Sequence, residues 1–87
     1  MKLKQTRTQG LRLKPLASNM TELTLQDGTR VLFSYETPVA YSKITELGRE
    51  TYKTNQYYSR TTSKHINKWE QTIHGEVNQS VLDELVK

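Results

Sequence analysis

The sequence predicts a small α+β domain, an antiparallel β-meander of three to four strands followed by two helices. Strand-like runs of β-branched and aromatic residues extend over about residues 20–58. An apolar stripe at helical spacing covers about 62–74, and a short apolar segment covers about 79–86. Strands followed by helices predict that the helices cover one face of the sheet.

The clearest strand signal is a hairpin around Asp27-Gly28. A two-residue type I′ loop places Leu23 opposite Leu32. A three-residue loop with a bulge flips one strand instead, and both registers stay open. In the type I′ register both strand faces are apolar, so this strand pair is either central in the sheet or covered on both sides.

Two further strands are predicted over 39–44 and 51–58, with a turn at 47–49 between them. Pro38 has no backbone donor and fits the start of an edge strand or a bend. Residues 11–14 alternate between apolar and basic and suit a short strand that stops at the following proline.

The first helix is predicted from Ile66, Trp69 and Ile73, which share one stripe. Residues 61–63 offer N-caps, and Gly75 has the position of a C′ glycine. Trp69 is interpreted as a core residue that fastens the helix to the sheet, with an exposed binding anchor as the alternative.

Length and composition predict one domain over residues 1–87, with residues 1–10 as a flexible basic arm. The chain has no Cys, which excludes disulfides and Cys-ligated zinc. Apolar runs are too short for a transmembrane span, so no membrane partner is expected. The expected location is the cytoplasm.

Positive charge gathers near the N-terminus and again between Arg49 and Lys68, and the formal net charge is +4. Such groups attract polyanions, although plain solubility charge is the alternative. The basic residues that precede any acid are predicted to form a secondary binding arm, which comprises Lys2, Lys4, Arg7, Arg12 and Lys14.

Enzyme chemistry is not indicated. His65 and His74 are nine residues apart, so on one helix they point to opposite sides and cannot share a metal. No Ser/His/Asp set, carboxylate pair or phosphate-binding Gly loop is evident. We therefore expect no catalytic residue, metal ion or cofactor.

The candidate binding surface is one face of the first helix. Lys64 and Lys68 are four residues apart, on the same side and away from the apolar stripe. Together with the free N–H groups of the helix N-terminus they suit an anion, while a solvated helix face is the alternative. The predicted binding residues are Arg60, Lys64, His65, Asn67 and Lys68. The predicted structural residues are Trp69, Ile66, Ile73, Gly28 and Pro38.

Two sequence blocks carry a family resemblance. Ser34–Ala40 reads SYETPVA, and Thr61–Trp69 reads TTSKHINKW. Together they resemble a small domain family of phage and other mobile-element proteins that has no assigned activity. The resemblance covers about residues 30–70 and implies origin and fold more than function.

The leading functional hypothesis is a non-enzymatic phage or mobile-element module that binds a host protein or complex, for example as an inhibitor of host defence. The alternative is a nucleic-acid-binding accessory protein. In that case the basic arm and the helix face contact phosphates, and Tyr57 or Tyr58 stacks on bases. An unpaired sheet edge also allows a homodimer.

Overall fold

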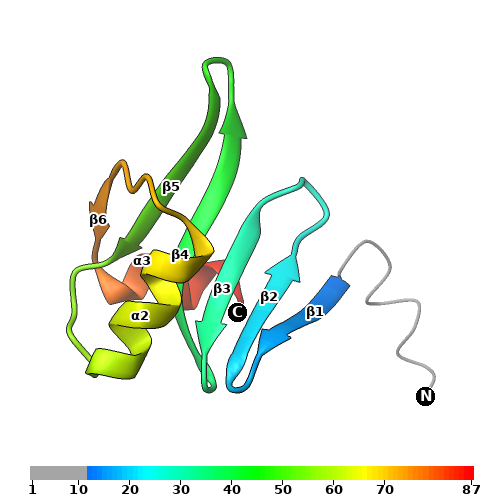
Figure 1. Ribbon diagram of the computed structural model, residues 1–87. Coiled ribbons are helices and arrows are strands. Elements are labelled where there is room, and N and C mark those ends of the chain that lie inside the picture. The colour runs from blue at the N-terminus through cyan, green and yellow to red at the C-terminus, as the bar shows by residue number, and fades with distance from the viewer. Residues whose placement is uncertain (1–11) are drawn as a thin grey trace.

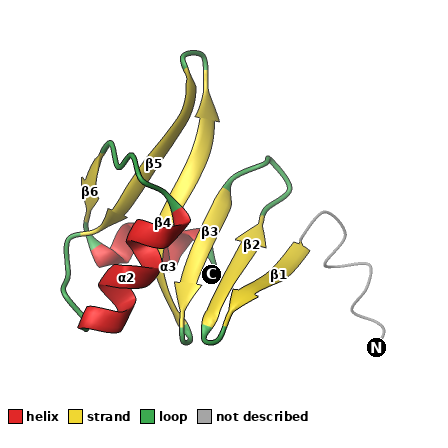
Figure 2. Ribbon diagram, viewed as in Figure 1, coloured by secondary structure: helices red, strands yellow, loops and turns green. Residues whose placement is uncertain are grey.

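The computed structural model describes residues 12–87, which form a six-stranded sheet flanked by two helices (Figure 1, Figure 2). The α+β class is confirmed, but the sheet has more strands than the three to four expected. The predicted arm over residues 1–10 lies outside the described residues. The elements in chain order are β1 (Arg12–Ala17), β2 (Met20–Thr24), β3 (Arg30–Ser34), β4 (Thr37–Thr45), β5 (Gly48–Thr54), α2 (Arg60–Trp69), β6 (Gly75–Val77) and α3 (Gln79–Leu85).

The strands follow one another across the sheet in chain order. β1 to β5 form an antiparallel meander, and β6 pairs with β5 in parallel. Parallel neighbours need a crossover connection, which α2 supplies. β1 continues past Pro15, where the sequence predicted a stop, because an edge strand tolerates the missing donor.

The β2–β3 hairpin adopts the three-residue alternative, with Leu23 opposite Val31 rather than Leu32. The Gly28 N–H donates to the Leu25 carbonyl at 3.0 Å. Gly28 has φ +92°, a backbone conformation that glycine adopts without steric cost. The type I′ register is therefore wrong, because Leu25 pairs with Thr29 and leaves three residues in the loop.

The side chain of Asp27 stabilises this loop through a hydrogen bond. Its Oδ1 accepts a hydrogen bond from the Thr29 backbone N–H at 2.9 Å. That bond is the main cause of the lowered pKa of the Asp27 carboxyl.

The helices lie on opposite faces of the sheet, so the prediction that they share one face is wrong. Figure 1 shows α2 in front of the sheet and α3 behind it. The apolar residues that β2 and β3 present on both faces require a cover on each side. The buried core under α2 comprises Met20, Leu32, Val39, Ala40 and Ile66. The buried core under α3 comprises Val31, Tyr41 and Leu82.

The first helix ends at Trp69, five residues before the predicted end at 74. The chain then returns to the sheet, where the His74 N–H donates to the Thr51 carbonyl at 2.7 Å. Gly75 therefore begins β6 and does not cap a helix. Ile73 packs on the α2-side core from this connection rather than from the helix.

Pro38 is buried near the start of β4, a central strand, so the edge-strand alternative for this residue is wrong. It lies opposite Phe33, beside a register shift between β3 and β4. Such an irregularity allows a proline without a backbone donor inside a sheet. The predicted strand over 51–58 ends earlier, at Thr54, which leaves Tyr57 and Tyr58 in the loop before α2.

Candidate functional site

Ser59 begins helix α2. Its backbone is extended, and its Oγ accepts a hydrogen bond from the Thr62 N–H at 3.1 Å. This N-cap lies two to four residues earlier than the caps predicted at 61–63. At the other end the Glu70 N–H donates to the Ile66 carbonyl at 3.1 Å. Thr62 and Ile66 are the buried residues of α2, so the opposite side of the helix faces solvent.

The solvent side of α2 carries a basic ridge, which we define as Arg60, Lys64, Asn67 and Lys68. All four side chains are exposed. Within residues 12–87, none of the four takes part in a side-chain hydrogen bond or ion pair. Residues three and four apart share a helix face, so the ridge is one continuous strip along the helix.

His65, the fifth predicted binding residue, turns away from the ridge toward β3. Its Nδ1 lies 2.8 Å from Ser34 Oγ, and that oxygen lies 2.9 Å from Thr62 Oγ1. The Tyr35 ring packs beside the imidazole at a centroid distance of 6.1 Å. Ser34 and Thr62 are buried, so His65 completes a polar tie between α2 and β3.

The Ser34–His65 pair does not form a nucleophile. Ser34 is 2% exposed, so a substrate cannot reach its Oγ. Within residues 12–87 no hydrogen bond joins His65 to a carboxylate that would orient the imidazole as a base. The described residues also contain no group of three or more side chains placed to hold a metal ion.

The fold gathers positive charge on the α2 face of the sheet. Strand alternation places Arg12 and Lys14 of β1 on this face, because they pair with Thr24 and Glu22. These two residues were predicted as part of a basic arm, and the structure places them in the sheet. Lys2, Lys4 and Arg7 lie outside the described residues. The basic residues on the α2 face are Arg12, Lys14, Arg30, Arg49, Lys53, Arg60, Lys64 and Lys68.

Two of these cations are engaged within the fold. Arg49 is half-buried and donates to the Ser42 carbonyl and to Ser42 Oγ, both at 3.0 Å. Lys53 lies 3.7 Å from the Glu76 carboxylate. The cations that remain for a partner are those of β1, Arg30 and the ridge.

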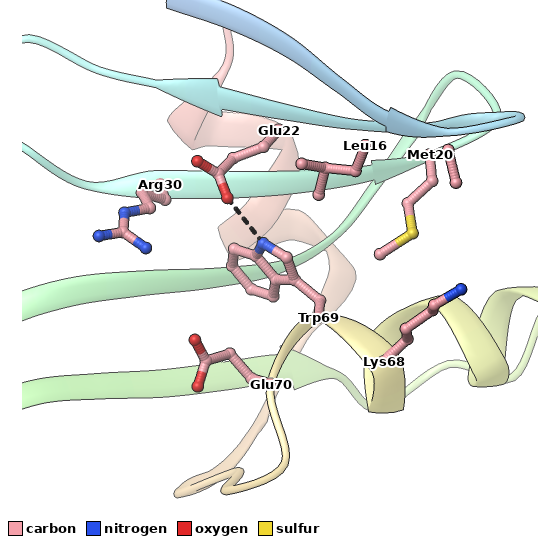
Figure 3. A pocket seen from close by; sticks show the side chains of 8 residues that line it. Leu16, Met20, Glu22, Arg30, Lys68, Trp69 and Glu70 are labelled. Carbon is pink, nitrogen blue, oxygen red and sulfur yellow. Dashed lines mark hydrogen bonds between the residues drawn. The ribbon is translucent and has the colours of Figure 1, made fainter.

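A pocket of about 300 Å³ opens where α2 ends against β1, β2 and β3 (Figure 3). We call it the Trp69 pocket. Its lining combines apolar side chains with both signs of charge. The lining residues are Leu16, Ala17, Met20, Glu22, Arg30, Lys68, Trp69 and Glu70. Lys68 belongs to both the pocket and the ridge, so the two features form one surface.

Trp69 is held in place across the pocket. Its Nε1–H donates to Glu22 Oε1 at 2.8 Å, as the dashed line in Figure 3 shows. Trp69 and Glu22 are both half-buried. A buried indole usually finds a partner for its N–H, and Glu22 meets this need from 47 residues away.

The sequence did not indicate the Trp69 pocket. Ile66 and Trp69 face the sheet, but Leu16, Glu22 and Arg30 come from strands whose register was open. Once Leu23 is known to pair with Val31, alternation places Glu22 on the same face as the helix. The register was therefore the missing signal.

Two tyrosines have shifted pKa values. A hydrogen bond to Glu50 at 2.8 Å raises the pKa of the Tyr52 hydroxyl. Burial, followed by the charge of Asp83, raises the pKa of Tyr58. Both hydroxyls stay neutral near pH 7, so they supply hydrogen bonds and not charge.

Comparison with known families gives one match. The model of a family described as "Family of unknown function (DUF8033)" matches residues 11–84. The chain belongs to the DUF8033 family. The match covers all six strands, α2 and all but the last residue of α3, so the ridge and the pocket lie inside the DUF8033 domain.

No curated protein and no solved structure matches this DUF8033 chain. None of the helices within residues 12–87 has the length and hydrophobicity that a membrane crossing requires.

Proposed function

We propose that this DUF8033 chain is a small, non-enzymatic binding module that docks on a partner protein through its α2 face. One observation carries the proposal. The basic ridge has no polar partner within residues 12–87, and it runs directly into a pocket of mixed polarity that contains a fixed tryptophan. Protein interfaces typically combine such an aromatic anchor with a charged rim.

The charges around the pocket favour a protein over a nucleic acid. Glu22 and Glu70 line the Trp69 pocket beside Arg30 and Lys68. Two carboxylates repel a phosphate backbone, whereas a protein surface can present groups of either sign to them. Mixed charge around an apolar pocket therefore suits a protein partner.

Nucleic-acid binding is the second candidate, and the loop before α2 favours it. Tyr57 is 73% exposed and Tyr58 39% exposed, directly before the ridge residue Arg60. Aromatic rings beside cations suit single-stranded nucleic acid, because its bases can stack on the rings and its phosphates can pair with the cations. In this case the ridge end near Arg60 is the contact region, and the Trp69 pocket is not needed.

The setting of the proposal rests on the sequence resemblance to phage and mobile-element proteins. On this resemblance we propose a partner in a host cytoplasm, and inhibition of a host defence complex as one form of the activity. Small binding modules of many folds work in this way, so this part of the proposal is an analogy.

The test compares a ridge variant with a matched control. The ridge variant carries Lys64→Glu and Lys68→Glu, so that it and the control each reverse two lysines. The control carries Lys43→Glu and Lys87→Glu, which reverse exposed cations outside the α2 face. Each tagged protein is used to capture partners from a host lysate, and the affinity of a recovered protein is then measured with purified components.

A partner that depends on the α2 face binds the wild type and the control equally. It binds the ridge variant more than about tenfold less tightly, because like charges across an interface cost several kcal/mol. Equal binding by the ridge variant contradicts the proposal. A salt titration with single-stranded oligonucleotides tests the second candidate, for which three phosphate contacts predict a log–log slope of about −2.

A further inference from the structure

We infer that the Trp69 pocket and the basic ridge form one recognition site for an extended acidic peptide segment with a single apolar anchor side chain. The inference rests on the proposed function and specifies the partner chemistry. The pocket receives the anchor, and the ridge pairs with carboxylates that follow it along the peptide.

The pocket suits one anchor. Its apolar part is formed by Leu16, Met20 and Trp69, and Figure 3 shows Leu16 and Met20 on one side of the indole. Its volume of about 300 Å³ is at the small end of the range for ligand pockets. Because Glu22 already accepts from the indole N–H, the ring offers its apolar surface to a ligand.

The spacing of the ridge suits an extended chain. Lys68, Lys64 and Arg60 follow one another at intervals of four residues, each about 6 Å along the helix axis. In an extended segment every second side chain points the same way, at a repeat of about 6.6 Å. Carboxylates at alternate peptide positions therefore meet successive ridge cations.

The carboxylates of the pocket fix the direction of the peptide. Figure 3 shows Glu22 and Glu70 near the indole, on the side away from Lys68. An acidic segment avoids these two groups and runs from the pocket over Lys68 toward Arg60. The charge pattern thus requires the apolar anchor at one end and the acids along the helix.

The experiment pans the intact chain against a library of random twelve-residue peptides. Enriched peptides are synthesised, and their affinity is measured through the fluorescence of Trp69, the only Trp of the chain. Leu16→Glu places a charge in the pocket, and Leu13→Glu is its matched control on β1. Leu13 is 71% exposed and lines a different groove, beside Phe33 and Tyr35. Lys64→Glu and its control Lys43→Glu test the ridge without altering the core.

We expect enriched peptides to carry an apolar residue with acids at alternate following positions, and to shift the Trp69 emission. Leu16→Glu is expected to weaken binding at least tenfold and Lys64→Glu about three- to tenfold. The two control variants are expected to keep wild-type affinity, and circular dichroism checks that every variant is folded.

Four results overturn the inference, and three of them come from the peptide experiment. Those three are an absence of enriched peptides, a consensus without acids, and unchanged binding by Leu16→Glu or Lys64→Glu. If the ridge variant still loses a captured partner protein, the proposed function stands without this peptide model. Oligonucleotide binding that is unchanged by Leu16→Glu but lost with Lys64→Glu also overturns the inference. That result would indicate that the ridge binds phosphate groups.

Discussion

The hydrogen bond between Trp69 and Glu22 is predicted to stabilise the domain by about 1 kcal/mol. Hydrogen bonds to charged groups contribute about 1.5–3 kcal/mol, and solvent access to these half-buried side chains reduces that value. Trp69→Phe removes the donor and some apolar contact, and Glu22→Ala removes the acceptor. A double-mutant cycle of the two substitutions isolates the bond from the other losses.

The assay is urea denaturation followed by far-UV circular dichroism, because Trp69→Phe removes the fluorescent reporter. A coupling of about 1 kcal/mol corresponds to about 4–8 °C in melting temperature for a domain of this size. The matched pair Trp69→Phe and Leu13→Ala should show no coupling, since Leu13 lies in a different groove. A coupling below about 0.3 kcal/mol for Trp69 and Glu22 would refute the reasoning.

Three further substitutions test the fold. Leu82→Ala should lower the free energy of unfolding by about 2–5 kcal/mol in calorimetry, because the Leu82 side chain is fully buried between α3 and the sheet. A loss below about 1 kcal/mol would contradict a packed core on the α3 side. Ser59→Ala should lower the free energy of unfolding by about 1 kcal/mol in urea denaturation, because it removes the N-cap of α2. Ser63→Ala inside α2 should lower it by less. A larger loss for Ser63→Ala than for Ser59→Ala would favour the N-cap position predicted from the sequence. The pKa of Asp27 in the folded protein lies below its ordinary value of 3.8. The carboxylate therefore stabilises the fold above that pH, and this stabilisation is lost as the pH falls through the folded pKa. Asp27→Asn should therefore lower the melting temperature at pH 7 and have a smaller effect at about pH 2, whereas an equal effect at both would argue against the loop bond.

Local patterns predicted the class of the fold but not its layers. Asp27-Gly28 marked a hairpin, and Ile66 with Trp69 marked the inner side of a helix. The side covered by the second helix depends on Leu82 meeting Val31 and Tyr41, which are distant in sequence. Neither periodicity nor capping encodes that contact, so the predicted shared face was wrong.

The end of the first helix was missed for a related reason. Ile73 continues the apolar period of Ile66 and Trp69, but it reaches the core from a connection to β6. The pairing of His74 with Thr51 competes with continued helix and prevails because it adds a strand to the sheet. Tertiary pairing here overrides a local pattern.

The ridge could be predicted from sequence, whereas the Trp69 pocket could not. Lys64 and Lys68 share a helix face whatever the rest of the chain does. His65 lies one position from Lys64, about 100° around the helix, which turns it toward Ser34. The pocket required the register that brings Glu22 to Trp69.

The central claim is that partners dock on the α2 face. The most direct measurement is a map of backbone amide shifts in the isotopically labelled chain upon addition of a captured partner or an enriched peptide. We expect the changes to concentrate at Arg60–Glu70 and at Leu16 to Glu22. Changes concentrated on α3, around Val81 and Leu85, would contradict it.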